Sequence, residues 1–427
     1  MMNTKILTVE EKIKMIREFM GYTQETFGEL IGTSKSTVAR YESQAPQHAK
    51  FVYSDEDIEY IKEKLGIKGA PLREDEYGPF KRKMYSWIDA MREDNDERAR
   101  ILHEELHVAV YLLFYPELML LYFLFEIKWL LRNEDLRKAE EKMKLVEIKL
   151  ENVSTEVLFE YYYTSGTMYF YKGDYEKALE FYKAANNYEI DSFDRGEMLS
   201  FNIAICYTEL GRCISAISSL ERVYNRSSHE RANVTWLSMA NTLALNCMKI
   251  GNTVTAKQIF GRALPEAEII GNDYYSGRTL HNLGCVFVAE KNFKKALEYF
   301  TKAATYIEND DNFFLENLFY KAFCLTVLGR PESRDIIAEG ESLSLKKEDE
   351  YYTLLFQTLY FLPNLSVEKY RDTIEQKTIP YLEGKHQYFK ATLFCEQLRG
   401  YYTKITRKMK IFETESILHR LLMSLLK

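Results

Sequence analysis

Apolar and polar residues along most of this chain follow the pattern of amphipathic helices. From Lys83 to the C-terminus, long helical stretches run with few breakers, whereas residues 9–65 show short helices separated by tight turns. Residues 66–82 concentrate Gly, Pro and charge, which is typical of a linker. The pattern predicts an all-α protein with a small helical domain (1–68), a linker (69–82) and a long helical domain (83–427).

The long region repeats itself, with predicted turns 38 or 40 residues apart at positions 173, 211, 251, 291 and 329. Each copy has a small residue in its first helix, an Ala in its second helix and large residues three or four positions away. The first copy shows this with Gly166, Ala178 and Tyr182. Small residues let neighbouring helices approach closely, and the large ones fill the remaining space. These offsets resemble the tetratricopeptide repeat, and the resemblance implies helix pairs stacked into a superhelix.

The composition narrows the class of protein. Apolar residues make up 46% of the chain, and Gly and Pro together number only 27, so large helical cores are expected and disorder is not. The six cysteines form no CxxC pair and lie in apolar stretches, which indicates reduced core thiols rather than disulfides. A net charge of −7 excludes a polyanion-coating protein, so any contact with nucleic acid requires a local module.

The most apolar stretch, Val108–Phe125, is long enough in principle to cross a bilayer. Pro116 and Glu117 interrupt it, and Pro followed by Glu is typical of the first turn of a new helix. We therefore expect two buried helices that meet at Pro116, and no membrane contact. The N-terminus MMNTKILTVEEK has no apolar core flanked by a cleavage site, so we expect no secretory signal. Together with the reduced thiols, this favours a cytoplasmic location.

Residues 23–42, TQETFGELIGTSKSTVARYE, predict two short helices around a turn at Gly32. Thr23 and Ser34 are suitable N-caps, and Val38 and Tyr41 mark the buried side of the second helix. The run resembles the Xre/Cro-type helix-turn-helix family, which binds an operator in double-stranded DNA. The resemblance implies a phosphate contact by Gln24, base-edge contacts by Lys35, Ser36 and Arg40, and backbone or base contacts by Ser34 and Thr37.

The charge of this region affects how it would bind DNA. Residues 1–65 hold nine Lys/Arg and eleven Asp/Glu, a net charge of −2, which favours only weak binding by one copy. We therefore expect a homodimer that reads two half-sites. The alternative is a helical hairpin that serves only for packing.

A helix-turn-helix followed by a long repeat superhelix resembles the Rap/NprR/PlcR/PrgX group of cytosolic peptide-pheromone receptors, which includes phage receptors of the same plan. Trp87–Asp135 looks like the helical bundle that precedes the repeats in the Rap and NprR members. The resemblance implies a quorum-sensing transcription regulator. A short signalling peptide would lie in the concave groove and shift dimer geometry and DNA binding.

Three asparagines occupy nearly the same place in the first helix of successive copies, Asn202, Asn241 and Asn282, 39 and 41 residues apart. An Asn amide both donates and accepts, so a ladder of Asn side chains can hold a peptide backbone. Arg278, His281, Glu316 and Tyr320 are expected on the same surface, where they would select side chains or a terminus. The alternative is that each Asn bonds only to a neighbouring repeat.

Two enzymatic alternatives remain open at this point. His103-Glu104-Glu105-Leu106-His107 is an HExxH string in which two histidines could share zinc with Glu104 as base, and Glu117 and Glu126 are the candidate third ligands. Rap members dephosphorylate a response regulator with a bundle Gln, but residues 105–107 contain none, which leaves binding without catalysis. We expect no enzyme, no catalytic residue, no metal and no cofactor.

Overall fold

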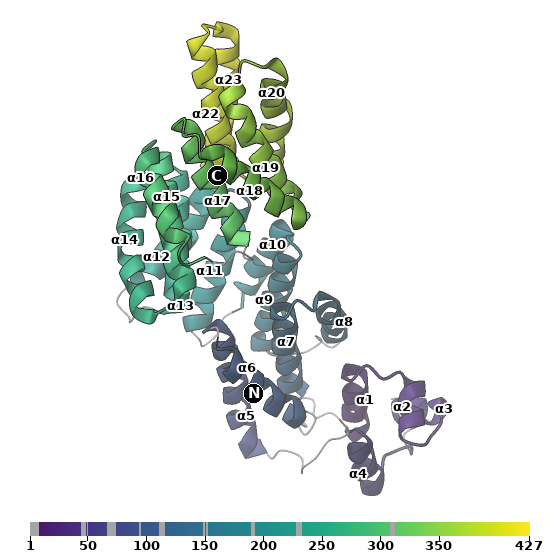
Figure 1. The fold of residues 1–427 in the computed structure, drawn as a ribbon. Coiled ribbons are helices and arrows are strands. Elements are labelled where there is room, and N and C mark those ends of the chain that lie inside the picture. Colours follow the sequence, from purple (N-terminus) through teal and green to yellow (C-terminus); the bar gives the residue numbers. More distant parts are fainter. Residues whose placement is uncertain are drawn as a thin grey trace. The chain divides into compact units, whose positions relative to one another are not determined.

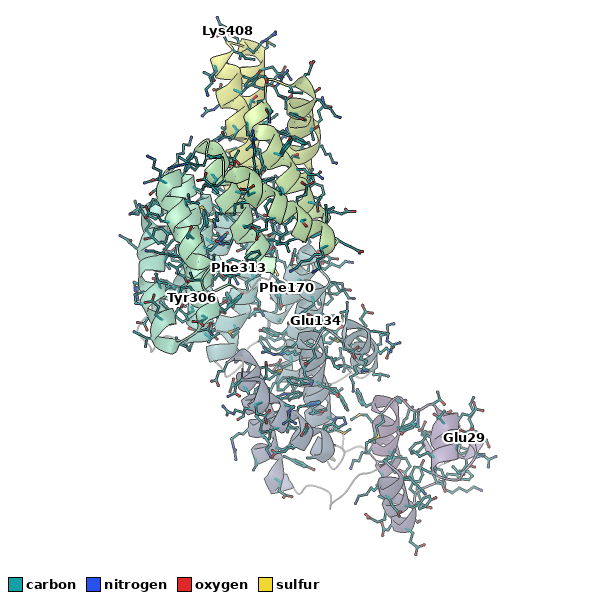
Figure 2. The ribbon with its side chains drawn as sticks, in the orientation of Figure 1. Glu29, Glu134, Phe170, Tyr306, Phe313 and Lys408 are labelled. Atoms are coloured by element: carbon teal, nitrogen blue, oxygen red, sulfur yellow. The ribbon has the colours of Figure 1, made fainter. Side chains whose placement is uncertain are left out.

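The computed structural model describes residues 8–43, 48, 50–65, 74–93, 95–110, 116–147, 150, 153–188, 193–227, 233–307 and 312–427. Every regular element in these ranges is a helix (Figure 1), and side chains fill the spaces between the helices (Figure 2). The predicted all-α fold is confirmed. Two compact units are present, Met1–Gly196 and Glu197–Lys427. The predicted boundaries of the small helical domain (1–68), the linker (69–82) and the long helical domain (83–427) fall inside the first unit. This division into domains stays a prediction.

The N-terminal helices fold around a small core of their own. Thr23 Oγ1 accepts from the Thr26 amide (3.1 Å) and caps the helix that begins at Gln24, and Ser34 Oγ accepts from the Thr37 amide (3.2 Å) and caps the helix that begins at Lys35. Gly32 has φ of 71° in the turn between them, a conformation that favours glycine. Phe27 and Val38 are fully buried in this core. The four helices are α1 (Val9–Phe19), α2 (Gln24–Leu30), α3 (Lys35–Tyr41) and α4 (Asp55–Lys64).

A helical bundle follows, and it begins earlier than the sequence indicated. Its helices are α5 (Glu74–Arg92), α6 (Asp96–Ala109), α7 (Pro116–Arg132) and α8 (Leu136–Glu147). Residues 74–82 of the predicted linker are helical because Phe80, Met84 and Trp87 form one buried face at helical spacing. Residues 69–73 lie outside the described ranges.

The apolar stretch tested as a membrane span belongs to the core of this bundle. Helix α7 begins at Pro116, as predicted, and its residues 118–125 are all buried. Among the described helices, none combines the length and the apolar character that crossing a bilayer requires. Apolar residues on all sides of α7 are explained by the helices that surround it.

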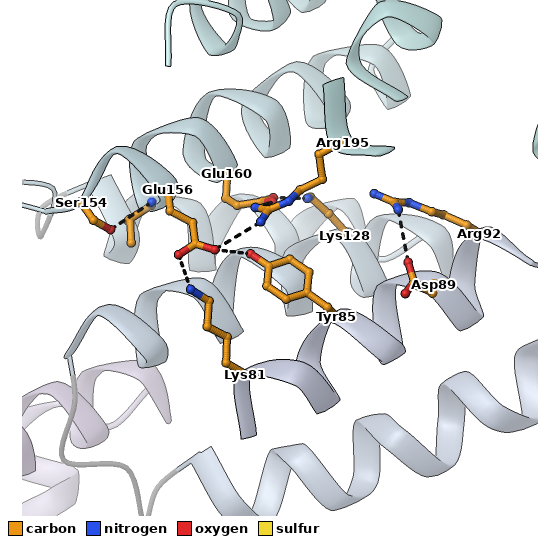
Figure 3. A network of polar contacts seen from close by, with 10 residues as sticks. Lys81, Tyr85, Asp89, Arg92, Lys128, Ser154, Glu156, Glu160 and Arg195 are labelled. Atoms are coloured by element: carbon orange, nitrogen blue, oxygen red, sulfur yellow. Dashed lines mark hydrogen bonds and ion pairs between the residues drawn. The ribbon is translucent and has the colours of Figure 1, made fainter. Parts of the chain in front are cut away.

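A buried charge network connects three helices of the first unit, α5, α7 and α9 (Thr155–Tyr171), to Arg195 (Figure 3). Glu160 receives Lys128 Nζ (2.6 Å) and Arg195 Nη1 (3.2 Å), and its side chain is 3% exposed. Glu156 accepts from Tyr85 Oη (2.7 Å) and from the ammonium of Lys81. Burial lowers the pKa of Lys128 and raises that of Tyr85, while the Glu160 carboxylate opposes the shift at Lys128. Each of these charges therefore depends on its partners.

The repeats have the predicted turns. Gly173, Gly211, Gly251, Lys291 and Gly329 all have φ between 59° and 86°. Four of these positions are Gly, for which this left-handed backbone carries no steric cost, and Lys291 adopts it as an exception. The first hairpin, α9 with α10 (Tyr175–Ala185), lies in the first unit. The second hairpin pairs α11 (Phe193–Glu209), whose residues up to Gly196 belong to the first unit, with α12 (Cys213–Ser227). The other three lie in the second unit: α13 (Val234–Lys249) with α14 (Thr253–Ile270), α15 (Asp273–Ala289) with α16 (Phe293–Ala303), and α17 (Asn312–Val327) with α18 (Ser333–Lys346).

The small residues of the repeats lie where a large ring packs against the backbone. A Cβ added to Gly284 would come within 2.5 Å of the Phe300 ring, and one on Gly340 within 2.2 Å of Phe356. The second unit continues beyond the repeats with α19 (Glu350–Phe361), a 3₁₀ turn (Leu362–Asn364), α20 (Glu368–Thr373), a π-helical turn (Ile374–Thr378), α21 (Ile379–Gly384), α22 (Tyr388–Lys404) and α23 (Lys408–Leu425). All six cysteines are buried and free of disulfides, as predicted.

Candidate functional site

A cavity of about 660 Å³ lies within the second unit, between the first helices of successive repeats and the C-terminal helices. Polar, charged and aromatic side chains line it together, which is typical of a ligand pocket. Five of the seven residues predicted to bind a peptide line it: Arg278, His281, Asn282, Glu316 and Tyr320. The other lining residues are Thr208, Glu209, Leu245, Met248, Lys249, Cys285, Phe313, Tyr351, Tyr352, Gln387, Phe389 and Lys390.

An ion pair crosses the cavity wall from α17 to α22. Lys390 Nζ lies 2.8 Å from Glu316 Oε1, and Tyr352 Oη donates to Glu316 Oε2 (2.7 Å). Burial alone would raise the pKa of Glu316, but the Lys390 ammonium outweighs it and holds that pKa below its usual range. Burial likewise disfavours the charged form of Lys390, and Glu316 reverses this and raises its pKa. Both groups are therefore charged at neutral pH.

His281 is held neutral in the same wall. Its Nδ1 lies 3.0 Å from Asn317 Oδ1, and its Nε2 lies 3.4 Å from Cys285 Sγ. Burial lowers the pKa of His281 to about 4, although Glu316 acts in the opposite direction. The ring lies 4.8 Å from that of Phe313 and 5.5 Å from that of Tyr320. The wall at this point is an aromatic surface with an uncharged imidazole.

The three asparagines do not form one ladder. Asn282 lines the cavity and donates Nδ2 to Asn241 Oδ1 (3.0 Å). Asn241 is 2% exposed, does not line the cavity, and donates to Thr279 Oγ1 (3.1 Å) on the next repeat. Asn202 lies on α11, half-buried, outside the lining set. Asn241 therefore fits the alternative of bonding only to a neighbouring repeat, because the close approach of α13 and α15 covers it, whereas Asn282 makes the same inter-repeat bond and also lines the cavity.

Sequence reasoning missed the part of the cavity that comes from α19 and α22. Lys390, Tyr352 and Gln387 lie beyond the last recognisable repeat, so no periodic offset marks them. The only sequence signal is polar residues within otherwise apolar helices, such as Lys390 beside the buried Ala391 and Leu393.

The second helix of the helix-turn-helix presents most of its predicted contact residues to solvent. Ser34, Lys35, Ser36 and Arg40 are exposed, and Thr37 is half-buried. Lys35 Nζ lies 3.8 Å from an exposed Glu25 carboxylate, a weak pair that a phosphate can displace.

Gln24 has an internal partner in the same domain. Its Nε2 donates to Glu42 Oε2 (2.9 Å), and the same carboxylate receives the Arg17 guanidinium. The amide thus helps to close the domain, and its predicted phosphate contact stays a prediction.

The HExxH string does not form a peptidase arrangement. Glu104, the residue that would act as base, accepts from Arg100 Nη1 (2.7 Å), and both side chains are more than half exposed. Glu117 accepts from the Ser154 amide (3.2 Å). The other candidate third ligand, Glu126, does approach both histidines. Of the two candidate third ligands, Glu126 alone is grouped with both histidines, because the packing of α6 on α7 brings it there.

Comparisons with known proteins agree with the fold. Tetratricopeptide-repeat family models match residues 159–189 and 236–308. A transcriptional activator of Geobacillus stearothermophilus, NprA, is 22% identical over 374 residues, which cover 84% of this chain and 91% of that protein.

Two solved structures share the fold. A Rap protein complexed with competence and sporulation factor has a TM-score of 0.68 at 16% identity, covering 82% of this chain and 99% of that one. The quorum sensor NprR in complex with its peptide NprX has a TM-score of 0.60 at 18% identity, covering 81% of this chain and 99% of that one. The resemblance predicted from sequence is confirmed.

Proposed function

We propose that this chain, which resembles the Rap/NprR/PlcR/PrgX group in sequence and fold, is a cytosolic, non-enzymatic transcription regulator controlled by a short signalling peptide. The peptide binds in the cavity of the second unit, and the helix-turn-helix binds an operator as a homodimer. The observation that carries the proposal is the convergence of Arg278, His281 and Glu316, from two repeats, on one cavity.

The chemistry of the cavity suits a peptide. Arg278 and Lys249 offer cations to a carboxylate, either of a side chain or of the C-terminus. Asn282 offers an amide that can bond to the peptide backbone. Phe313, Tyr320 and the neutral His281 provide an aromatic face for one apolar side chain.

We expect Asn282→Ala to weaken binding of the cognate peptide roughly ten- to hundredfold, since removal of one buried hydrogen bond costs about 1–3 kcal/mol of binding free energy. Arg278→Ala is expected to do the same through loss of a charge-assisted bond. Calorimetry with peptides encoded in short reading frames beside the gene measures this.

Asn241→Ala is the matched control, because it breaks the same Asn241–Asn282 bond without touching the cavity. If Asn241→Ala and Asn282→Ala lower the affinity for the peptide equally, and Arg278→Ala does not lower it at all, the cavity is not the peptide site.

For DNA, we expect Lys35→Ala and Arg40→Ala each to cost about 1–3 kcal/mol of the free energy of operator binding. Both should also relax base preference, because both side chains are exposed where base edges would lie. Glu29→Ala, at an exposed position of α2 outside the predicted contact set, is the control. Footprinting on the operator measures the effect. Equal protection by the Lys35/Arg40 double variant and the wild type would contradict the assignment.

A further inference from the structure

A cluster of metal-ligating side chains lies in the bundle, away from the cavity and the DNA-binding helices. His103 and His107 occupy positions i and i+4 of α6, so both face α7, where Glu126 lies. One ligand atom from each residue lies within 4.8 Å of the other two. His107 Nδ1 is 3.8 Å from Glu126 Oε1. These three residues come from two helices, α6 and α7.

One nitrogen in this cluster has no partner. His103 Nε2 is buried and makes no hydrogen bond to any residue that the structure describes, although buried polar atoms in proteins are nearly always bonded. The His103 ring packs against Trp129 and Trp87, at centroid distances of 5.3 and 5.1 Å, and these two rings also contact each other. An imidazole nitrogen fixed in this way is available to a ligand.

The other two residues are oriented by their neighbours. Lys142 Nζ donates to Glu126 Oε2 (2.7 Å), so the second carboxylate oxygen, Oε1, is the one near His107. Tyr122 Oη lies 3.1 Å from His107 Nδ1. The Lys142 contact is of the type that orients metal-ligating carboxylates in known sites. Tyr122 Oη instead approaches the His107 nitrogen that lies nearest Glu126, so an ion bound there would take the place of this hydrogen bond. The Glu126 side chain is 7% exposed and that of His107 is 46% exposed, so solvent reaches the cluster from the His107 side.

We propose that His103, His107 and Glu126 bind one divalent transition-metal ion of the zinc class. Two imidazoles and one carboxylate are a known zinc ligand set, and water can take the fourth position from the exposed side. Tetrahedral zinc separates its nitrogen and oxygen ligand atoms by about 3.4 Å, so side-chain rotations that bring these atoms closer together by up to about 1.4 Å would close the site. The nitrogen ligands favour zinc, nickel or copper over magnesium and calcium, which prefer oxygen.

The ion would have a structural role in this bundle. Peptide hydrolysis by an HExxH site needs the glutamate as base beside the ion, and the Glu104 side chain is 62% exposed and is not part of the cluster of His103, His107 and Glu126. A bound ion would instead connect α6 to α7 and stabilise the bundle, because it binds the folded state only.

Zinc and cobalt titration of the full-length protein, dialysed against chelator, tests the proposal. We expect one equivalent of Zn²⁺ by calorimetry, a four-coordinate Co²⁺ visible spectrum, and no response to Mg²⁺. His107→Ala is the preferred variant, because its half-exposed side chain can be removed without opening the core, and Glu126→Gln keeps the shape of the carboxylate. Each variant should weaken Zn²⁺ binding at least tenfold. The control variant His419→Ala, which replaces an exposed histidine on α23, should leave Zn²⁺ binding unchanged.

Zinc should also raise the melting temperature of the wild type but not that of His107→Ala. Absence of Zn²⁺ binding by the wild type, or equal binding by wild type, His107→Ala and Glu126→Gln, overturns the proposal. Zinc-dependent peptide hydrolysis abolished by Glu104→Gln would overturn the structural role.

Discussion

Replacing Glu160 by alanine is expected to destabilise the first unit by about 3–5 kcal/mol. The carboxylate is 3% exposed and is the shared partner of Lys128 and Arg195 (Figure 3). Without it, the Lys128 ammonium, whose side chain is 13% exposed, would be left without its counter-ion. Because burial already lowers the pKa of Lys128, the expected response is loss of its proton or opening of the bundle to water.

Glu140→Ala provides the matched control for this prediction. Glu140 Oε1 and Lys172 Nζ are also 2.6 Å apart, but their side chains are 40% and 28% exposed, so solvent screens the pair and little change is expected. Urea unfolding in a Trp236→Phe background measures both variants, because the remaining tryptophans, Trp87 and Trp129, report only on the first unit. Equal midpoints for the two variants would show that burial does not strengthen the network.

The repeat fold could be predicted because its signals are local and periodic. Gly173, Gly211, Gly251 and Gly329 mark left-handed turns that glycine adopts most easily, and the spacing alone indicated Lys291. The start of α5 could not be predicted in this way. Gly78 and Pro79 signal a break, but burial of Phe80 and the apolar residues after it favours a helix.

The cavity was predictable only where it uses the repeats. Arg278 and Glu316 occur in first helices, whose inward faces the repeat pattern indicates. Lys390 pairs with Glu316 across 74 residues, from a helix with no repeat signature, and only packing of the whole unit brings them together. Glu126 is a similar case, because its distance from His103 depends on how α6 and α7 pack.

Replacing Lys390 by methionine is expected to destabilise the second unit by about 3 kcal/mol, since it leaves the Glu316 carboxylate beside Tyr352 without its counter-ion. The double variant Glu316→Gln/Lys390→Met should recover most of that loss, because a neutral amide needs no cation and methionine fills the space of the lysine stem. Arg420→Met, which breaks an exposed pair with Glu383 in the same unit, should cost less than about 1 kcal/mol. Hydrogen exchange in α17 and α22 measures all three.

The same double variant separates folding from ligand binding. It should regain stability yet bind the cognate peptide about ten- to hundredfold more weakly, because the cavity has lost two charged groups, each able to make a charge-assisted bond of about 1.5–3 kcal/mol. Stability and affinity would then change independently, which is expected only if the peptide contacts this wall. A double variant that is stable and binds the peptide like the wild type would show that Glu316 and Lys390 serve the fold alone, and would move the peptide to the Arg278 and Lys249 side of the cavity.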